Sequence, residues 1–121
     1  MGDLLPRTKK FALDVLAFTR KMPRGMEEDG IRRQLVRSGP SVGAHYRAAQ
    51  RGRSKDDFLY KIEGALEEAD ESQYWFELLV DSGMCATPAA QALRKEAGEL
   101  TAIFSSIAKK MKEKGAGKRR S

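Results

Sequence analysis

Few side chains in this sequence could carry out covalent or metal chemistry. There is one histidine, His45, and one cysteine, Cys85, far apart along the chain. Residues 67–71 are rich in carboxylates, but a di-iron site in a helical bundle requires Glu-x-x-His on two helices, which a single histidine cannot supply. Cys85 has no recognisable base partner, and neither a Gly-x-Ser-x-Gly elbow nor a phosphate-binding glycine loop is present. We therefore expect no metal, no cofactor and no enzymatic activity.

Arginines are the side chains whose type and spacing suggest a function. Six of them lie on or just after the second predicted helix: Arg32, Arg33, Arg37, Arg47, Arg51 and Arg53. Guanidinium groups bind phosphate oxygens bidentately and keep their charge, so this stretch predicts a nucleic-acid-binding surface, with Lys109 and Lys110 of the fourth helix as further contacts. The alternative is that these arginines form ion pairs with the acidic third helix, within one subunit or between subunits.

The charge of the chain is divided into three blocks. Residues 1–54 carry twelve Lys or Arg against five Asp or Glu, residues 55–91 carry two against nine, and residues 92–121 carry nine against three. The net charge of +6 therefore combines two basic flanks with an acidic middle. Packed helices could neutralise one another in this arrangement, and basic surface could also remain exposed for a polyanion. The two interpretations are compatible.

The composition indicates one globular domain. With 121 residues, 40% of them hydrophobic and 33% charged, the chain can form a single core. No apolar run approaches the roughly 20 residues that span a bilayer. The first residues lack the apolar core of a signal peptide, and a lone cysteine cannot form an internal disulfide. We expect a cytoplasmic protein that does not enter a membrane.

The spacing of apolar residues predicts helices in the first half of the chain. In the first helix, over residues 6–22, Phe11, Val15 and Phe18 share a face. In the second helix, which begins near Glu27, Gly39 and Gly43 are spaced so that another backbone could approach closely. Pro40 predicts a kink there, because proline removes a helical hydrogen bond. The alternative is a pair of short helices joined by a turn at Gly39-Pro40.

The third and fourth predicted helices carry clear start signals. Ser54 is a serine N-cap followed by acids, and Thr87 is a threonine cap with proline at the first helical position. Apolar side chains near the end of the third helix point around nearly the whole circumference. A helix that is apolar on all sides must be covered on all sides, so we predict a subunit interface that contains Tyr74, Trp75 and Leu78.

The predicted fold class is all-α, since no segment shows the alternating pattern of a strand. Long helices and short connections favour an antiparallel up-down-up-down four-helix bundle, here with a kinked second helix. The bundle domain is expected to cover residues 1–114, and residues 115–121 are predicted to form a disordered basic tail.

Three segments of this chain together resemble a known family. They are RSGPSVGAHYRAA at residues 37–49, SKDDF at residues 54–58 and ALEEADESQYWFELL at residues 65–79. The chain resembles, over roughly residues 10–110, the bacterial four-helix-bundle family first noticed as open reading frames in intervening sequences of 23S ribosomal RNA. It departs from the usual pattern at His45, where Asn is common, and at Ala48, where Glu is common.

The resemblance implies an antiparallel four-helix bundle assembled as a ring-like homopentamer. The family is similar to the accessory variability determinant proteins of diversity-generating retroelements, which are basic pentameric barrels that bind nucleic acid and a reverse transcriptase. No catalytic residues of the family can be carried over to this chain.

Two functions of different kinds follow from these observations. The first is a non-enzymatic, pentameric nucleic-acid-binding or scaffold protein whose partners are copies of itself, RNA or DNA, and a protein such as a reverse transcriptase. The second is a protein–protein interaction adaptor, in which the charges serve subunit assembly and the recognition of a protein partner.

Overall fold

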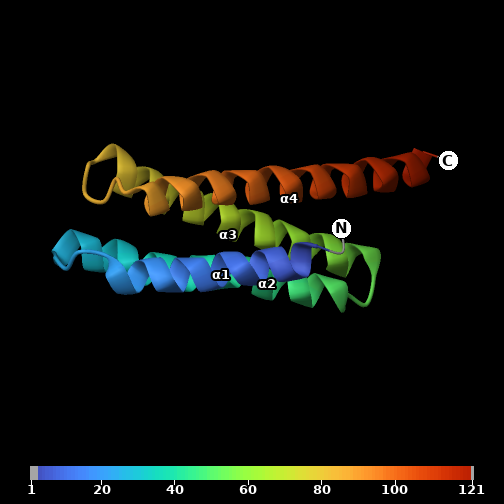
Figure 1. The fold of residues 1–121 in the computed structure, drawn as a ribbon. Coiled ribbons are helices and arrows are strands. Elements are labelled where there is room, and N and C mark those ends of the chain that lie inside the picture. The colour runs from blue at the N-terminus through green and yellow to red at the C-terminus, as the bar shows by residue number, and fades with distance from the viewer. Residues whose placement is uncertain (1–2, 121) are drawn as a thin grey trace.

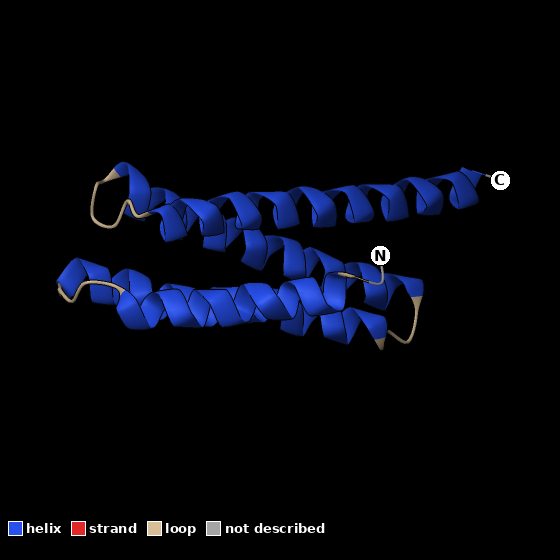
Figure 2. Cartoon of the chain, viewed as in Figure 1, coloured by secondary structure: helices blue, strands red, loops and turns tan. Residues whose placement is uncertain are grey.

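The computed structural model describes residues 3–120, with side chains described up to residue 115. It consists of four α-helices, and the described residues contain no strand: α1 (Leu4–Lys21), α2 (Met26–Gln50), α3 (Lys55–Asp81) and α4 (Pro88–Arg120). Short connections join consecutive helices, which run in opposite directions along the molecule (Figures 1 and 2). The predicted all-α, antiparallel four-helix bundle is confirmed.

The side chains that were predicted to cap the third and fourth helices do so in the structure. The Ser54 hydroxyl accepts a hydrogen bond from the backbone N–H of Asp57 at 3.0 Å and so caps α3. At the start of α4, the Thr87 hydroxyl accepts from the backbone N–H of Ala90 at 3.2 Å. After the end of α3, Gly83 has a φ of 78°, a left-handed conformation that suits glycine.

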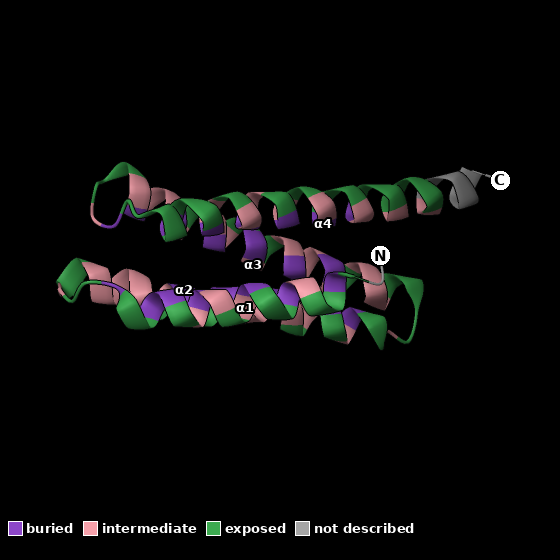
Figure 3. Ribbon diagram, in the orientation of Figure 1, coloured by how far each residue is buried: buried purple, intermediate pink, exposed green. Residues whose placement is uncertain are grey.

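The helices pack in chain order around one apolar core. α2 packs along α1 and α3, and α3 packs along α4, whereas α1 and α4 touch only weakly. Each helix contributes fully buried side chains, and two edge-on or tilted aromatic pairs link distant helices: Phe18 with Phe76 at 5.4 Å and Tyr46 with Phe104 at 5.7 Å between ring centroids. Figure 3 shows the buried positions on the inward-facing sides of the helices.

The second helix is continuous through Pro40, so the alternative of two short helices is wrong. Its glycines act as the sequence suggested. A Cβ atom added at Gly39 would lie 2.8 Å from Val15 Cγ1, and one added at Gly43 would lie 3.2 Å from Thr8 Oγ1. The absence of side chains at these positions therefore lets α1 lie close against α2. The kink expected at Pro40 stays a prediction.

Two expectations concern the chain as a whole. Among the described residues, no helix combines the length and the apolar character needed to cross a membrane. The disordered basic tail predicted for residues 115–121 falls almost entirely outside the described side chains, although α4 runs to Arg120. That part of the prediction, and the limit of the bundle at residue 114, stay predictions.

Candidate nucleic-acid interface

Four exposed cations on α1 and α2 form what we call the basic face: Lys9, Arg33, Arg47 and Arg51. Arg33 lies on α2 and Arg51 is the first residue after its end. Eighteen residues are five whole turns of a helix, so the two positions fall on the same side of α2. Lys9, Arg47 and Arg51 line a common groove between α1 and α2. Within the described part of the chain, none of the four side chains forms an ion pair.

The groove between α1 and α2 has a volume of about 880 Å³ and an unusual lining. Its other lining residues are mostly small or apolar, and none is a carboxylate: Leu5, Pro6, Thr8, Ala12, Pro40, Gly43, Ala44, Ala48 and Gln50. The reason lies in the sequence, because residues 30–55 contain no Asp or Glu. No carboxylate in the groove lining neutralises these cations, so they attract an anionic ligand from solution.

Arg37 behaves differently from its neighbours on α2. Its guanidinium donates hydrogen bonds to both carboxylate oxygens of Glu68 at 3.1 Å and to the carboxylate of Glu71. These hydrogen bonds, first to Glu71 and then to Glu68, raise the pKa of Arg37, and Arg37 lowers the pKa of Glu71. Arg37 thus forms the ion pair with the acidic third helix that the sequence offered as the alternative.

Arg32 holds the end of α1. Its guanidinium donates to the backbone carbonyls of Thr19 and, at 2.9 Å, Pro23, and to Asp29 Oδ1 at 3.0 Å. Carbonyls at a helix C-terminus lack intrahelical donors, and an arginine that satisfies them also interacts favourably with the helix dipole. The terminal nitrogens of Arg32 already donate hydrogen bonds within the protein, so we do not include Arg32 in the basic face.

The other predicted contacts lie away from the basic face. Arg53 is in the connection between α2 and α3, and its backbone N–H donates to Asp57 Oδ2 at 3.1 Å. Lys109 and Lys110 are exposed on α4, a helix that packs mainly on α3 and meets α2 across the core through the ring pair of Phe104 and Tyr46. The structure therefore groups Arg33, Arg47 and Arg51 and leaves the other predicted cations elsewhere.

Lys9 is the member of the basic face that sequence reasoning missed. It lies on α1, and only the pairing of α1 with α2 places it across the groove from Arg47 and Arg51. The sequence does show that residues 4–13 contain no acid, as residues 30–55 do not, and this absence could have pointed to Lys9.

The predicted subunit interface lies on α3. Tyr74 is 52% exposed, and Trp75 and Leu78 are half-buried, whereas Phe76 and Leu79 are fully buried in the core. The rings of Tyr74 and Trp75 lie 5.3 Å apart, and the buried indole Nε1 of Trp75 lies near the Glu71 carboxylate without a hydrogen bond of normal geometry in the described structure. Of these predicted interface residues, Tyr74 is therefore the one most exposed to solvent.

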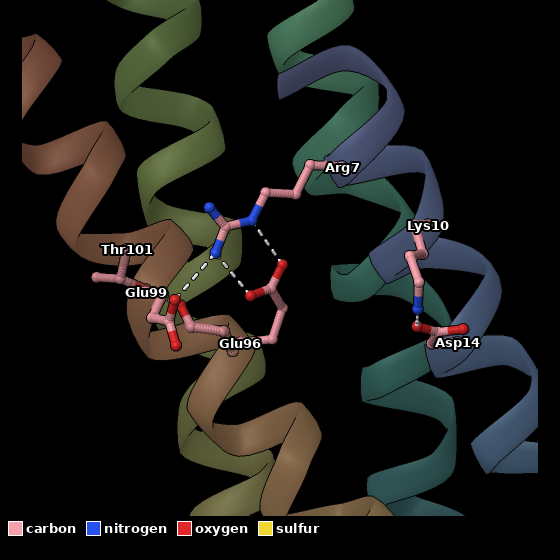
Figure 4. A network of polar contacts seen from close by, with 7 residues as sticks. Arg7, Lys10, Asp14, Glu96, Glu99 and Thr101 are labelled. Carbon is pink, nitrogen blue, oxygen red and sulfur yellow. Dashed lines mark hydrogen bonds and ion pairs between the residues drawn. The ribbon is translucent and has the colours of Figure 1, made fainter. Parts of the chain in front are cut away.

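The weak seam between α1 and α4 is bridged by Arg7 (Figure 4). Arg7 binds Glu96 bidentately, with both hydrogen bonds at 2.8 Å, and donates to Glu99 Oε1 at 3.1 Å. The hydrogen bond to Glu96 is the main cause of the raised pKa of Arg7. Arg7 and Glu96 also line a mostly apolar groove of about 840 Å³ between the two helices, which contains Phe11, Phe18 and Leu93.

His45 lies against α3 beside Gly64. A Cβ atom added at Gly64 would be 2.8 Å from His45 Nδ1, and His45 Nε2 is 3.8 Å from Glu68 Oε2. The ring thus occupies the space that a side chain at residue 64 would fill. The described residues contain no group of three or more His, Cys, Asp or Glu side chains placed to hold a metal ion.

These features define a class of protein, an all-α antiparallel four-helix bundle with cations grouped on one pair of helices. Residues 3–106 match the family of 23S rRNA-intervening sequence proteins, and the chain belongs to that family. A crystal structure of a protein with unknown function from the S23 ribosomal protein family of Bacteroides thetaiotaomicron VPI-5482 is similar, with a TM-score of 0.78 and 28% identity. The similarity covers 87% of this chain and 97% of that chain. No curated protein matches the chain.

Proposed function

We propose that this protein is a non-enzymatic homo-oligomer, a pentamer, that binds nucleic acid or serves as a scaffold by holding phosphate groups on its basic face. The observation that supports this proposal is the grouping of Lys9, Arg47 and Arg51 around a groove without a carboxylate. Arginine and lysine side chains that have no partner in the protein remain available to phosphate oxygens. A protein partner such as a reverse transcriptase, which the family resemblance implies, belongs to the same proposal.

The test is a salt titration of nucleic-acid binding, followed by fluorescence anisotropy. Affinity should fall linearly on a logarithmic scale as salt rises, with a slope of about −0.9 for each phosphate contact on a duplex. Alanine at all four positions of the basic face should weaken binding and reduce that slope by up to about 3 to 4. No binding to any RNA or DNA at low salt would end this proposal.

A matched control separates the basic face from the net charge of the protein. Lys95, Lys109, Lys110 and Lys114 are exposed on α4 and, like the basic face, form no ion pair within the described residues. Their replacement by alanine removes the same number of charges. If both quadruple variants lose affinity equally, the basic face has no special role and the binding is a general effect of charge. Thermal melts verify that both variants fold.

One observation favours the second candidate, a protein–protein adaptor whose charges serve assembly and partner recognition. Residues 62–81 of α3 contain seven Asp or Glu and no Lys or Arg, and two of these acids already bind Arg37. Light scattering behind a sizing column, at low and high salt, tests this candidate. An oligomer that dissociates as salt rises, together with no nucleic-acid binding, would favour the adaptor over the first proposal.

A further inference from the structure

We propose that the ligand of the basic face is a double-stranded segment of nucleic acid, which this face contacts through its phosphate backbone and not through its bases. This inference rests on the proposed function and names the class of nucleic acid that the surface fits. Three features of the described residues support it: a row of cations along one continuous helix, a face wider than the major groove of B-DNA, and a groove lining without aromatic rings.

The cations of α2 form a rigid row. Arg33 lies on α2 and Arg51 directly follows its last residue, Gln50, and the eighteen residues between the two positions correspond to roughly 27 Å at 1.5 Å per residue. α2 is held on both sides, since it packs along α1 and α3, and Gly39 lets α1 approach closely. A row of this length matches about eight steps of a duplex backbone at 3.4 Å per step. A single strand would have to be straightened to follow the same row, which costs conformational entropy.

The basic face is wider than one helix. Lys9 comes from α1 and Arg47 from α2, on opposite sides of the groove between the two helices. Each helix with its side chains is about 10–12 Å across, whereas the major groove of B-DNA is about 12 Å wide and admits a single helix. Two helices side by side therefore contact the phosphate ridges and do not reach the base edges within the major groove.

The face also lacks the side chains with which proteins bind unpaired bases. Single-strand binders stack bases on aromatic rings. No Phe, Tyr, Trp or His lines the groove between α1 and α2, and the highly exposed Tyr60 and Tyr74 are on α3. The sequence contains no Asn, and Gln50 is the one amide side chain in the groove lining, so few groups can read an adenine.

Anisotropy measurements with probes of equal length and sequence test the inference. The probes are a single DNA strand of about 16 nucleotides without self-complementarity, its DNA duplex and the corresponding RNA duplex, roughly twice the length of the row. We expect the full-length protein to bind both duplexes at least about tenfold more tightly than the strand at the same salt concentration. A duplex of unrelated sequence should bind within about twofold, because phosphate contacts carry no sequence information.

The outcomes separate this inference from the proposed function. If the single strand binds as tightly as the duplexes, or if two duplexes of different sequence differ more than about tenfold, the inference is wrong while nucleic-acid binding stands. If no probe binds at low salt, both are wrong. If the DNA duplex and the RNA duplex bind with different affinity, the tighter one identifies the nucleic acid that the basic face prefers. The substitutions Arg47→Ala and Arg51→Ala should together reduce the preference for duplex over strand, whereas Lys109→Ala with Lys110→Ala should leave that ratio unchanged.

Discussion

Gly39 is a single residue on which the contact between α1 and α2 depends. It is buried against Val15, and a methyl group at this position would come within 2.8 Å of Val15 Cγ1 and 3.0 Å of Val15 Cβ. Val15 is itself fully buried, so it has no room to move aside. A side chain at residue 39 must therefore push α1 and α2 apart.

We expect Gly39→Ala to lower the free energy of unfolding by about 1–3 kcal/mol, the usual cost of overpacking a core. Gly30→Ala is the matched control, since it lies in the same helix and a Cβ there meets nothing within 4 Å. Alanine is a better helix former than glycine, so the control should gain up to about 1 kcal/mol. Urea unfolding followed by circular dichroism measures both. Equal effects of the two substitutions would show that the contact with Val15 does not matter.

The carboxyl of Glu71 links the stability of the protein to pH. Arg37 holds the pKa of Glu71 below its ordinary value of 4.5. A carboxyl whose pKa is lower in the folded protein stabilises the fold above the unfolded value, and this contribution is lost as pH falls through the folded value. We therefore expect the Tm to drop as pH falls below about 4.5.

The variant Glu71→Gln should show a smaller drop of the Tm over that acidic range and should be less stable than the wild type near neutral pH. The control is Glu67→Gln, an exposed carboxylate of the same helix that forms no ion pair in the part of the chain described here. A pH profile of Glu71→Gln that coincides with the wild-type profile would contradict the assigned role of the pair.

At the scale of the elements, α2 and α3 are joined across the core by two serines. Ser72 Oγ donates to Ser38 Oγ at 2.8 Å, and both side chains are fully buried. A buried hydroxyl without a partner costs more than the bond gains, because its desolvation is not compensated. The pair therefore fixes how α3 sits against α2, and with it the register that places Glu68 and Glu71 opposite Arg37.

Single replacement of Ser38 or Ser72 by alanine should cost about 1 kcal/mol of unfolding free energy, since each leaves one hydroxyl in the core without its partner. The double variant should cost clearly less than the two single variants added together. A double-mutant cycle based on urea unfolding gives this difference. Additive effects would mean that the two hydroxyls do not depend on each other.

Among neighbouring helices of the bundle, α1 and α4 pack least, so Arg7 matters more there than a surface arginine usually does. It bridges the two helices through Glu96 and Glu99 and lines the apolar groove between them. We expect Arg7→Ala to speed amide hydrogen exchange in the first turns of α1, because the end of the helix loses its tie to α4. Lys10→Ala is the control, since the ion pair that Lys10 forms within the described residues is with Asp14 of its own helix, and its attraction to Glu96 is much weaker. Equal exchange in both variants would contradict the bridging role.

For the whole molecule, local signals were enough to predict the architecture. Caps such as Ser54 and Thr87 and the helical spacing of apolar residues depend on near neighbours in the chain, and both were confirmed. Arg33 and Arg37 could not be told apart in the same way. They are four residues apart on one helix, and only the position of α3 decides that Arg37 meets Glu68 while Arg33 meets no carboxylate in the described structure. Lys9 could not be predicted from the sequence for the same reason, because its place opposite Arg47 depends on the register of α1 on α2.

The assembly of subunits is the last property that belongs to the whole molecule. We expect the oligomer to require Tyr74, which is 52% exposed beside Trp75 and therefore open to a second subunit. A carboxylate at this position would have to be desolvated at an interface, and it would add to an already acidic helix. Tyr74→Glu should therefore reduce the mass measured by light scattering at micromolar concentration.

Met26→Glu is the control for this experiment. Met26 is 90% exposed at the start of α2, so a charge there changes the surface as much as at residue 74 but lies on a different helix from the predicted interface. If Met26→Glu dissociates the oligomer and Tyr74→Glu does not, the interface involves the start of α2 and not α3. If the unaltered chain is already monomeric, the half-exposed apolar side chains of α3 do not bind a second subunit, and the pentameric part of the proposed function is wrong.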